Sequence, residues 1–210
     1  MHEAARSRAF AAWLENARGA AKPQRPEQEL LAEHYLMQAV LAAMEEEARQ
    51  LLGHRPLRPE FWKGVAEFIG NFSHRVHRLK EEQILFPALE AWGLLEPEAC
   101  QRLQADHEEL KQLTWLLCDA VHHGDWAQAF RVVAVYLGRM RAHLEGEEGG
   151  LLSPGLAGVG AEGIDPLAAR FARLEAETLG ERGRLPYVEI MRSLCLEAGI
   201  APPDGTVARA

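Results

Sequence analysis

The sequence has few cysteines and no long apolar run. Its three cysteines, Cys100, Cys118 and Cys195, are odd in number and lack the spacing of a metal site. We interpret them as reduced residues of a cytoplasmic protein, because a disulfide framework needs paired cysteines. No apolar run is long enough to cross a bilayer, and no apolar signal segment follows the first residues. These absences predict a cytoplasmic location and no membrane partner.

The chain also lacks basic runs and strand-like alternation. Its 23 Lys and Arg residues against 31 Asp and Glu residues leave a net charge of -8, whereas a nucleic-acid surface needs a basic face. We therefore expect no nucleic-acid partner. No segment alternates apolar and polar residues with the period of two that strands require. An all-α protein with one core and appendages is the fold class that remains.

Prolines, glycines and apolar spacing divide the chain into helical segments. The segments predicted as helices cover residues 4–18, 26–52, 59–92, 97–123, 125–148, 165–179 and 187–198. The predicted organisation has three parts, which are 1–25 (N-terminal helix and linker), 26–154 (central unit) and 155–210 (helical extension). Within the extension we expect a flexible connection at 155–164 and a disordered tail from Pro202. Its apolar residues are too many to leave in water, so it should pack on the central unit or on a second copy in a homodimer.

One motif occurs twice in the central unit. In each copy a histidine is followed, after three residues, by two glutamates, and then by two residues, an apolar pair and a proline. The copies run from His77 to Pro87 and from His143 to Pro154. Each copy is preceded by a shorter motif, an acidic residue directly before a histidine, at Glu33-His34 and at Asp106-His107. The order of these motifs indicates an internal duplication.

The spacing within each copy suits metal binding. Residues four apart lie one above the other on a helix, so His77 and Glu81 can direct their donor atoms at the same volume. A single such pair is more often part of a solvated charged face. The duplication favours the other interpretation, because four imidazoles and two carboxylates from four helices suit a two-metal site inside a bundle.

These residues resemble the hemerythrin-like, or HHE cation-binding, family over about residues 28–154. The run from Lys80-Glu81-Glu82 to Phe86-Pro87 is the most specific part of the resemblance. The resemblance implies an up-down four-helix bundle with two non-haem irons in its core, to which this chain adds one N-terminal and two C-terminal helices. The ligands that it implies are His34 and His77 for one iron, His107 and His143 for the other, and Glu81 and Glu147 as bridges.

One position departs from the oxygen carriers of that family. They have a second histidine four residues after the one on the third bundle helix, and here that residue is Lys111. Lys111 either extends to solvent or turns inward to pair with Glu148 or a bridging carboxylate. Either way one iron loses a nitrogen ligand, which puts reversible oxygen carriage in doubt. His74, one turn before His77, and Tyr136, two turns before His143, are further candidates for an extra ligand or a supporting contact.

The resemblance leaves two classes of function open. The first is a protein that binds or senses oxygen, or a related diatomic or peroxide ligand, at the di-iron site. The second is an enzyme that reduces nitric oxide or peroxide at the same site, or a repair protein that donates iron. A purely structural cation site is the least favoured, because a chain of this length and apolar content needs no metal to fold.

Overall fold

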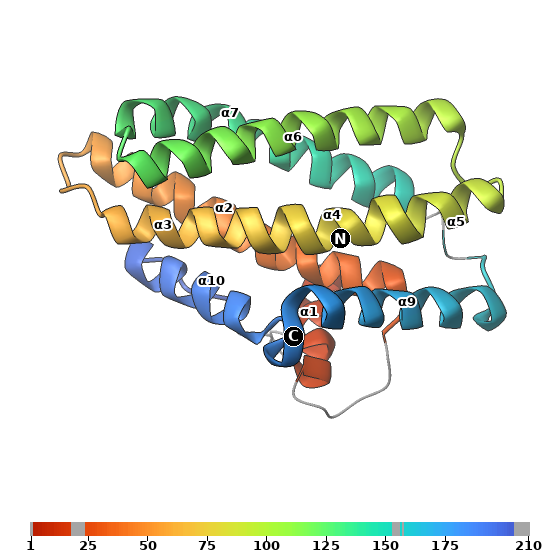
Figure 1. Cartoon of the computed structure of the whole chain (residues 1–210). Helices are drawn as coiled ribbons and strands as arrows, with labels where there is room; N and C mark the ends of the chain where they lie inside the picture. The colour runs from red at the N-terminus through yellow and green to blue at the C-terminus, as the bar shows by residue number, and fades with distance from the viewer. Residues whose placement is uncertain (1, 18–23, 153–155, 157, 204–210) are drawn as a thin grey trace.

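The computed structural model describes residues 2–17, 24–152, 156 and 158–203, and every regular element in these ranges is a helix (Figure 1). The elements are α1 (His2–Ala17), α2 (Pro26–Leu52), α3 (Pro59–Glu67), η1 (Phe68–His77), α4 (Arg78–Lys80), η2 (Glu81–Leu85), α5 (Phe86–Ala91), α6 (Pro97–His123), α7 (Trp126–Glu147), η3 (Glu148–Leu152), α9 (Ala161–Leu179), η4 (Gly180–Arg182) and α10 (Leu185–Ala198). The predicted all-α class is confirmed. None of the described helices is long and apolar enough to cross a membrane.

Four long helical rods form the up-down bundle. The second rod is continuous from Pro59 to Ala91 through α3, η1, α4, η2 and α5, and we call it the α3–α5 rod. Helix α6 packs between this rod and α7, and α2 closes the ring by contacting both α7 and the rod.

Local chemistry sets where the bundle helices end and begin. Gly124 ends α6 with a left-handed φ of 70°, and the side chain of Asp125 caps α7 by accepting a hydrogen bond from the Gln128 N–H at 3.0 Å.

The α3–α5 rod contains two stretches of π-helix, η1 and η2, where i→i+5 hydrogen bonds widen the turns. His77 is the last residue of η1 and Glu81 the first of η2. A third π-helical stretch, η3, starts at Glu148 directly after Glu147. Such turns are uncommon and occur often at functional sites. Here they lie at the glutamate pairs of both copies of the sequence motif.

The appended helices cover one side of the bundle. Helix α1 packs on α2, α9 on α2 and the rod, and α10 on α2 and the rod. Figure 1 shows α9 and α10 on the side of the molecule away from α6 and α7. The apolar residues of α10, among them Val188 and Met191, join the larger apolar cluster, and Phe171 of α9 joins the smaller one. The extension therefore packs on the bundle of its own chain.

Two apolar clusters flank a polar layer in the bundle. On α2, Leu30 belongs to the smaller cluster and Met37 to the larger, with His34 between them. On α7 and η3, Leu144 and Leu151 belong to different clusters. The same change of cluster occurs on the rod and on α6, so each bundle helix contributes its polar residues at one level.

The extension differs from the sequence-based prediction at its start. We expected a helix from Asp165 with Pro166 in its first turn, but α9 begins at Ala161 and Pro166 lies inside it. The added turn buries Ile164, and this apolar gain outweighs the backbone hydrogen bond that Pro166 cannot donate. The expected flexible connection at 155–164 is therefore helical from Ala161, while residues 153–155 and 157 lie outside the described residues. Residues 204–210 of the predicted tail lie outside them too, as do residues 18–23 between the first two helices.

Candidate metal centre

The structure brings together all six side chains predicted to bind metal. They come from the four rods at one level, with His34 on α2, His77 and Glu81 on the α3–α5 rod, His107 on α6, and His143 and Glu147 on α7. All six are buried. A shared centre requires each of the four rods to present its donor residue at the same height along the bundle. The duplicated motif supplies a histidine at this height on every rod.

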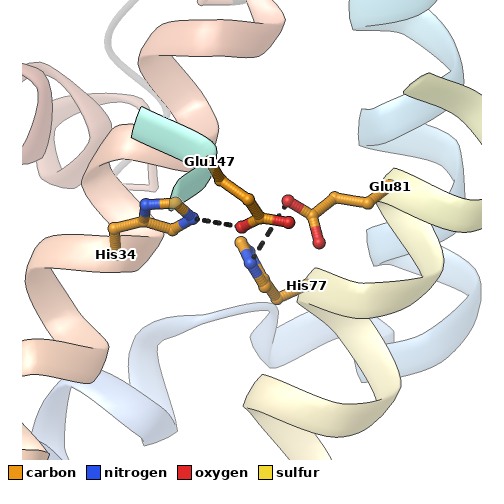
Figure 2. Close-up of side chains that lie close together, drawn as sticks. All are labelled: His34, His77, Glu81 and Glu147. Atoms are coloured by element: carbon orange, nitrogen blue, oxygen red, sulfur yellow. Dashed lines mark ion pairs between the residues drawn. The ribbon is translucent and has the colours of Figure 1, made fainter. Parts of the chain in front are cut away.

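One group of donors consists of His34, His77, Glu81 and Glu147, and their donor atoms all lie within 4.8 Å of one another. Figure 2 shows these side chains pointing toward one another from three of the rods. The Nε2 atom of His34 lies 3.4 Å from a carboxylate oxygen of Glu147. The Nε2 atom of His77 lies 3.5 Å from Oε1 of Glu81.

The second group consists of His107, His143, Glu81 and Glu147, again within 4.8 Å of one another. His107 Nε2 lies 3.3 Å from Oε2 of Glu81 and 3.7 Å from Oε1 of Glu147. His143 Nε2 lies 3.4 Å from Oε2 of Glu147. The two groups share both carboxylates, so a carboxylate oxygen faces each pair of imidazoles.

The inner atoms of this centre fit cations. Among the buried side-chain atoms without a hydrogen-bond partner are both carboxylate oxygens of Glu81, both of Glu147, and the Nε2 atoms of His34 and His77. Buried polar atoms are rarely left without a partner, because their desolvation is costly. Imidazole nitrogens and carboxylate oxygens together are a common donor set for transition metals. The carboxylate oxygens and the two imidazole nitrogens that a metal would need at the His34–His77 position are thus left without protein partners, whereas the Nε2 atoms of His107 and His143 lie 3.2 Å from each other.

A second set of carboxylates holds the far side of three imidazoles. The Nδ1–H groups of His34, His77 and His107 donate to Glu148 at 3.0 Å, Glu33 at 2.9 Å and Glu82 at 2.9 Å, respectively. A donated Nδ1–H fixes the tautomer and turns the lone pair of Nε2 inward. His143 differs, because its buried Nδ1 has no hydrogen-bond partner.

Sequence reasoning missed these pairings. Glu33, Glu82 and Glu148 stood in the motifs as neighbours of ligand candidates, and each contacts a histidine of another helix. Glu33 adjoins His34 in the sequence but pairs with His77. The doubled glutamates were a usable signal, since one carboxylate can face inward while the next reaches the adjacent rod.

Two of the four imidazoles, those of His34 and His107, hold a proton more strongly than usual, whereas burial lowers the pKa of His143. Burial alone lowers the pKa of His34, but contacts with Glu147 and Glu148 outweigh it and raise the pKa to about 9. Burial also lowers the pKa of His107, but contacts with Glu147, Glu81 and Glu82 outweigh this effect and raise the pKa to about 11. Burial tends to raise the pKa of Glu147, but the charge of His143 and the contacts with His107 and His34 hold it well below its usual value. The carboxylates thus attract positive charge.

A small chamber adjoins the centre. His77, His107 and His143 lie on its wall together with the side chains of Ser73 and Thr114. Its volume of about 20 Å³ is enough for one water-sized molecule. A molecule in it would therefore touch imidazoles of both donor groups.

Two of the three additional candidates lie near this chamber. His74 is half-buried on its wall, where burial first, and then the charges of Arg78 and Lys111, lower its pKa to about 4. Tyr136 is buried, which raises its pKa, while hydrogen bonds with Ser73 and Thr114 act in the opposite direction. Its hydroxyl thus meets the two hydroxyl side chains of the chamber wall.

Lys111 does not reach the centre. Its ammonium forms an exposed ion pair with Glu108 at 2.8 Å, one turn back on α6. The alternative that it turns inward to pair with Glu148 or a bridging carboxylate is wrong, because its ammonium is exposed beside Glu108, and Glu148 pairs with His34 and Arg6. On α6, His107, Leu110 and Thr114 are buried toward the chamber, and this face leaves position 111 outside.

A comparison with protein families agrees with this geometry. The model of the family described as the hemerythrin HHE cation binding domain matches residues 25–153. No curated protein and no solved structure matches the chain.

Proposed function

Because the chain belongs to the hemerythrin HHE cation-binding family, we propose that it holds two non-haem iron ions and binds or senses oxygen or a related small oxidant. His34 and His77 would hold one iron, His107 and His143 would hold the other, and Glu81 and Glu147, which belong to both donor groups, would be shared between them. When bound, the two irons supply a redox-active pair with positions free for a small ligand.

The observation that carries this proposal is the sharing of Glu81 and Glu147 between two groups of buried donors. Two imidazoles per position match the borderline character of iron, and two negative carboxylates offset the charge of two cations. Each donor group offers two imidazoles and two shared carboxylates, a small number of protein donors that would leave room for an exogenous ligand on a bound iron.

The chamber sets the size of that ligand. Its volume of about 20 Å³, enough for one water-sized molecule, suits a diatomic or peroxide ligand better than an organic substrate. The hydroxyls of Ser73 and Thr114 can donate hydrogen bonds to a ligand that carries negative charge. Burial keeps bulk water away from these groups, which strengthens such hydrogen bonds.

The second candidate function is an enzyme that reduces nitric oxide or peroxide, or a repair protein that donates iron. The open positions and the absence of a ligand at residue 111 favour it over simple carriage of oxygen. His74 and the Ser73–Thr114–Tyr136 hydroxyls also place polar hydrogens beside the chamber, where a reaction that consumes protons would use them.

Rapid-mixing absorption spectroscopy separates these functions. The protein is reconstituted with iron(II) without air and mixed with oxygen, hydrogen peroxide or nitric oxide. A stable oxygen-dependent spectrum that reverses on removal of oxygen supports binding or sensing, and repeated turnover of peroxide or nitric oxide supports the enzyme. Identical traces for wild type and a His107→Ala, His143→Ala double variant would refute both. His123→Ala, which changes an exposed histidine on α6, is the control.

A further inference from the structure

We propose that Arg6, Glu175 and Arg184 are positioning residues that make the His34–His77 position the tighter of the two metal positions. This inference depends on the proposed two-iron site. All three residues lie outside residues 25–153, the part of the chain that matches the family. The appended helices would then complete one half of the metal centre in addition to covering the bundle.

The C-terminal contribution passes through Lys80. This lysine is fully buried on α4, and its ammonium forms ion pairs with Glu29, Glu33 and Glu175. Glu33 uses one carboxylate oxygen for Lys80 and the other for the Nδ1–H of His77, at 2.9 Å. A continuous chain of charged contacts therefore runs from Glu175 on α9, through Lys80 and Glu33, to a metal-binding imidazole.

Arg184 fixes the outer end of this chain. It follows η4 and pairs with Glu175 at 2.5 Å, and its guanidinium carbon lies 4.3 Å from the centroid of the Trp13 ring on α1. Phe171, one turn before Glu175 on α9, places its ring centroid 5.7 Å from the Lys80 ammonium. Phe171 and Glu175 of the C-terminal segment thus contact Lys80 directly, while Trp13 of the N-terminal segment contacts the Arg184 that holds Glu175.

The N-terminal contribution passes through Glu148. Arg6 of α1 lies 2.7 Å from Oε2 of Glu148, and Oε1 of Glu148 accepts the Nδ1–H of His34 at 3.0 Å. The arrangement repeats that of the C-terminal chain, with a cation from an appended helix, a carboxylate and then an imidazole. Both imidazoles of the His34–His77 position are therefore held from outside the family domain.

The His107–His143 position lacks this support. Glu82, the partner of His107, is held by Arg78 of its own rod at 3.1 Å and is partly exposed, and His143 has no partner on Nδ1. These imidazoles come from α6 and α7, on the side of the bundle that the appended helices leave uncovered (Figure 1). Both also lie on the chamber wall. Because His77 also lies on that wall, it is the weaker support, and not the access of a ligand, that makes this position the one expected to exchange metal first.

The carboxylates around Lys80 are not a third metal site. Glu29, Glu33 and Glu175 come close enough to hold a cation, but the Lys80 ammonium already forms ion pairs with all three. The charge of these carboxylates raises the pKa of Lys80 above its usual value in spite of burial, which acts the other way. The Lys80 ammonium thus stands where a metal cation would otherwise bind, and it keeps its positive charge across the neutral pH range.

Titration of the metal-free full-length chain with Co²⁺ tests the inference, because the visible absorption of Co²⁺ reports each position as it fills. Wild type should show two binding steps of different affinity. His77→Ala should abolish the tighter step and His143→Ala the weaker one. Two steps of equal affinity, or the opposite assignment, would overturn the inference. Binding of fewer than two Co²⁺ ions by wild type would instead refute the proposed function.

Variants of the supporting residues test the positioning role. Glu175→Gln and Arg6→Gln should each weaken the tighter step by roughly 10- to 100-fold, the usual cost of losing a residue that orients a ligand. The weaker step should change by less than about threefold. Glu177→Gln on α9 and Arg8→Gln on α1 are matched controls, because both residues are exposed near the residue that is changed.

A purely structural role would weaken both steps together and lower the melting temperature, so thermal unfolding of the metal-free variants is measured alongside. Equal weakening of both steps, or no change in either, contradicts the proposal. If Glu175→Gln does not fold, Arg6→Gln and the order of filling in wild type still decide the question.

Discussion

Loading the metal-free protein with metal should release protons, and the structure predicts how many. The donors compete with protons because a metal needs the lone pair that a proton would occupy. The pKa of His34 is raised to about 9 and that of His107 to about 11, so both imidazoles are doubly protonated and cationic at pH 7.5. Glu147 is already ionised at this pH, since its pKa lies well below the usual value.

The expected release is therefore about two protons per chain at pH 7.5, one from each histidine with a raised pKa. Metal affinity should rise with pH, because each proton displaced adds roughly a tenfold change per pH unit as long as the pH is below that histidine's pKa. For the His34–His77 position this dependence should level off near pH 9. For the other position it should continue above pH 9.

Isothermal titration calorimetry with Zn²⁺, in buffers of different ionisation enthalpy, counts the protons released. His107→Gln should release about one proton fewer than wild type. His123→Ala removes an exposed histidine and should leave the count unchanged. A wild-type count near zero, or an affinity that does not depend on pH between 6.5 and 9, would refute the reasoning.

Four further outcomes follow from the same contacts. His77→Ala and His143→Ala should keep their helical circular dichroism at room temperature, because the apolar clusters and not the metal supply most of the stability; an unfolded variant would disprove this. Deletion of residues 160–210 should cause aggregation in size-exclusion chromatography, since it uncovers the apolar faces under α9 and α10, and a soluble, uniform product would argue against it. Lys111→His should leave iron spectra and peroxide kinetics unchanged, because position 111 is outside the centre, so altered spectra would show that α6 can rotate. Despite burial, Lys80 and His77 lower the pKa of Glu33 to about 2. Ionised Glu33 should therefore add at most on the order of 3 kcal/mol to the free energy of unfolding above pH 4.5, and this contribution should be lost as the pH falls toward 2. A Glu33→Gln protein with an unchanged midpoint of acid unfolding would contradict this.

Local chemistry made much of the fold predictable. Pro26, Pro59 and Pro97 stand at the starts of α2, α3 and α6, where a missing backbone N–H costs nothing. The same rule failed at Pro166, because the burial of Ile164 extends α9 by a turn ahead of it. A proline in a helix marks a start only where no apolar residue before it has a partner to pack on.

The site could be predicted as a set of donors because its motif is repeated at helical spacing. Its surroundings could not. Lys80 stands beside two glutamates and has the sequence appearance of a surface residue, yet it is fully buried. Its three carboxylate partners lie 47 to 95 residues away in the chain, so no local pattern connects them. Lys111 shows the converse. Its spacing from His107 left both an outward and an inward position open, and the packing of α6 places it outward.

Iron analysis of the reconstituted protein tests the central claim most directly. The chain is loaded with iron(II) without air, freed of unbound metal by gel filtration, and assayed for iron and protein together. Two irons per chain in wild type, and a loss of both in a Glu81→Ala, Glu147→Ala double variant that still folds, are the results that we predict. A reproducible content of one iron or fewer per wild-type chain would contradict the shared-carboxylate, two-iron centre.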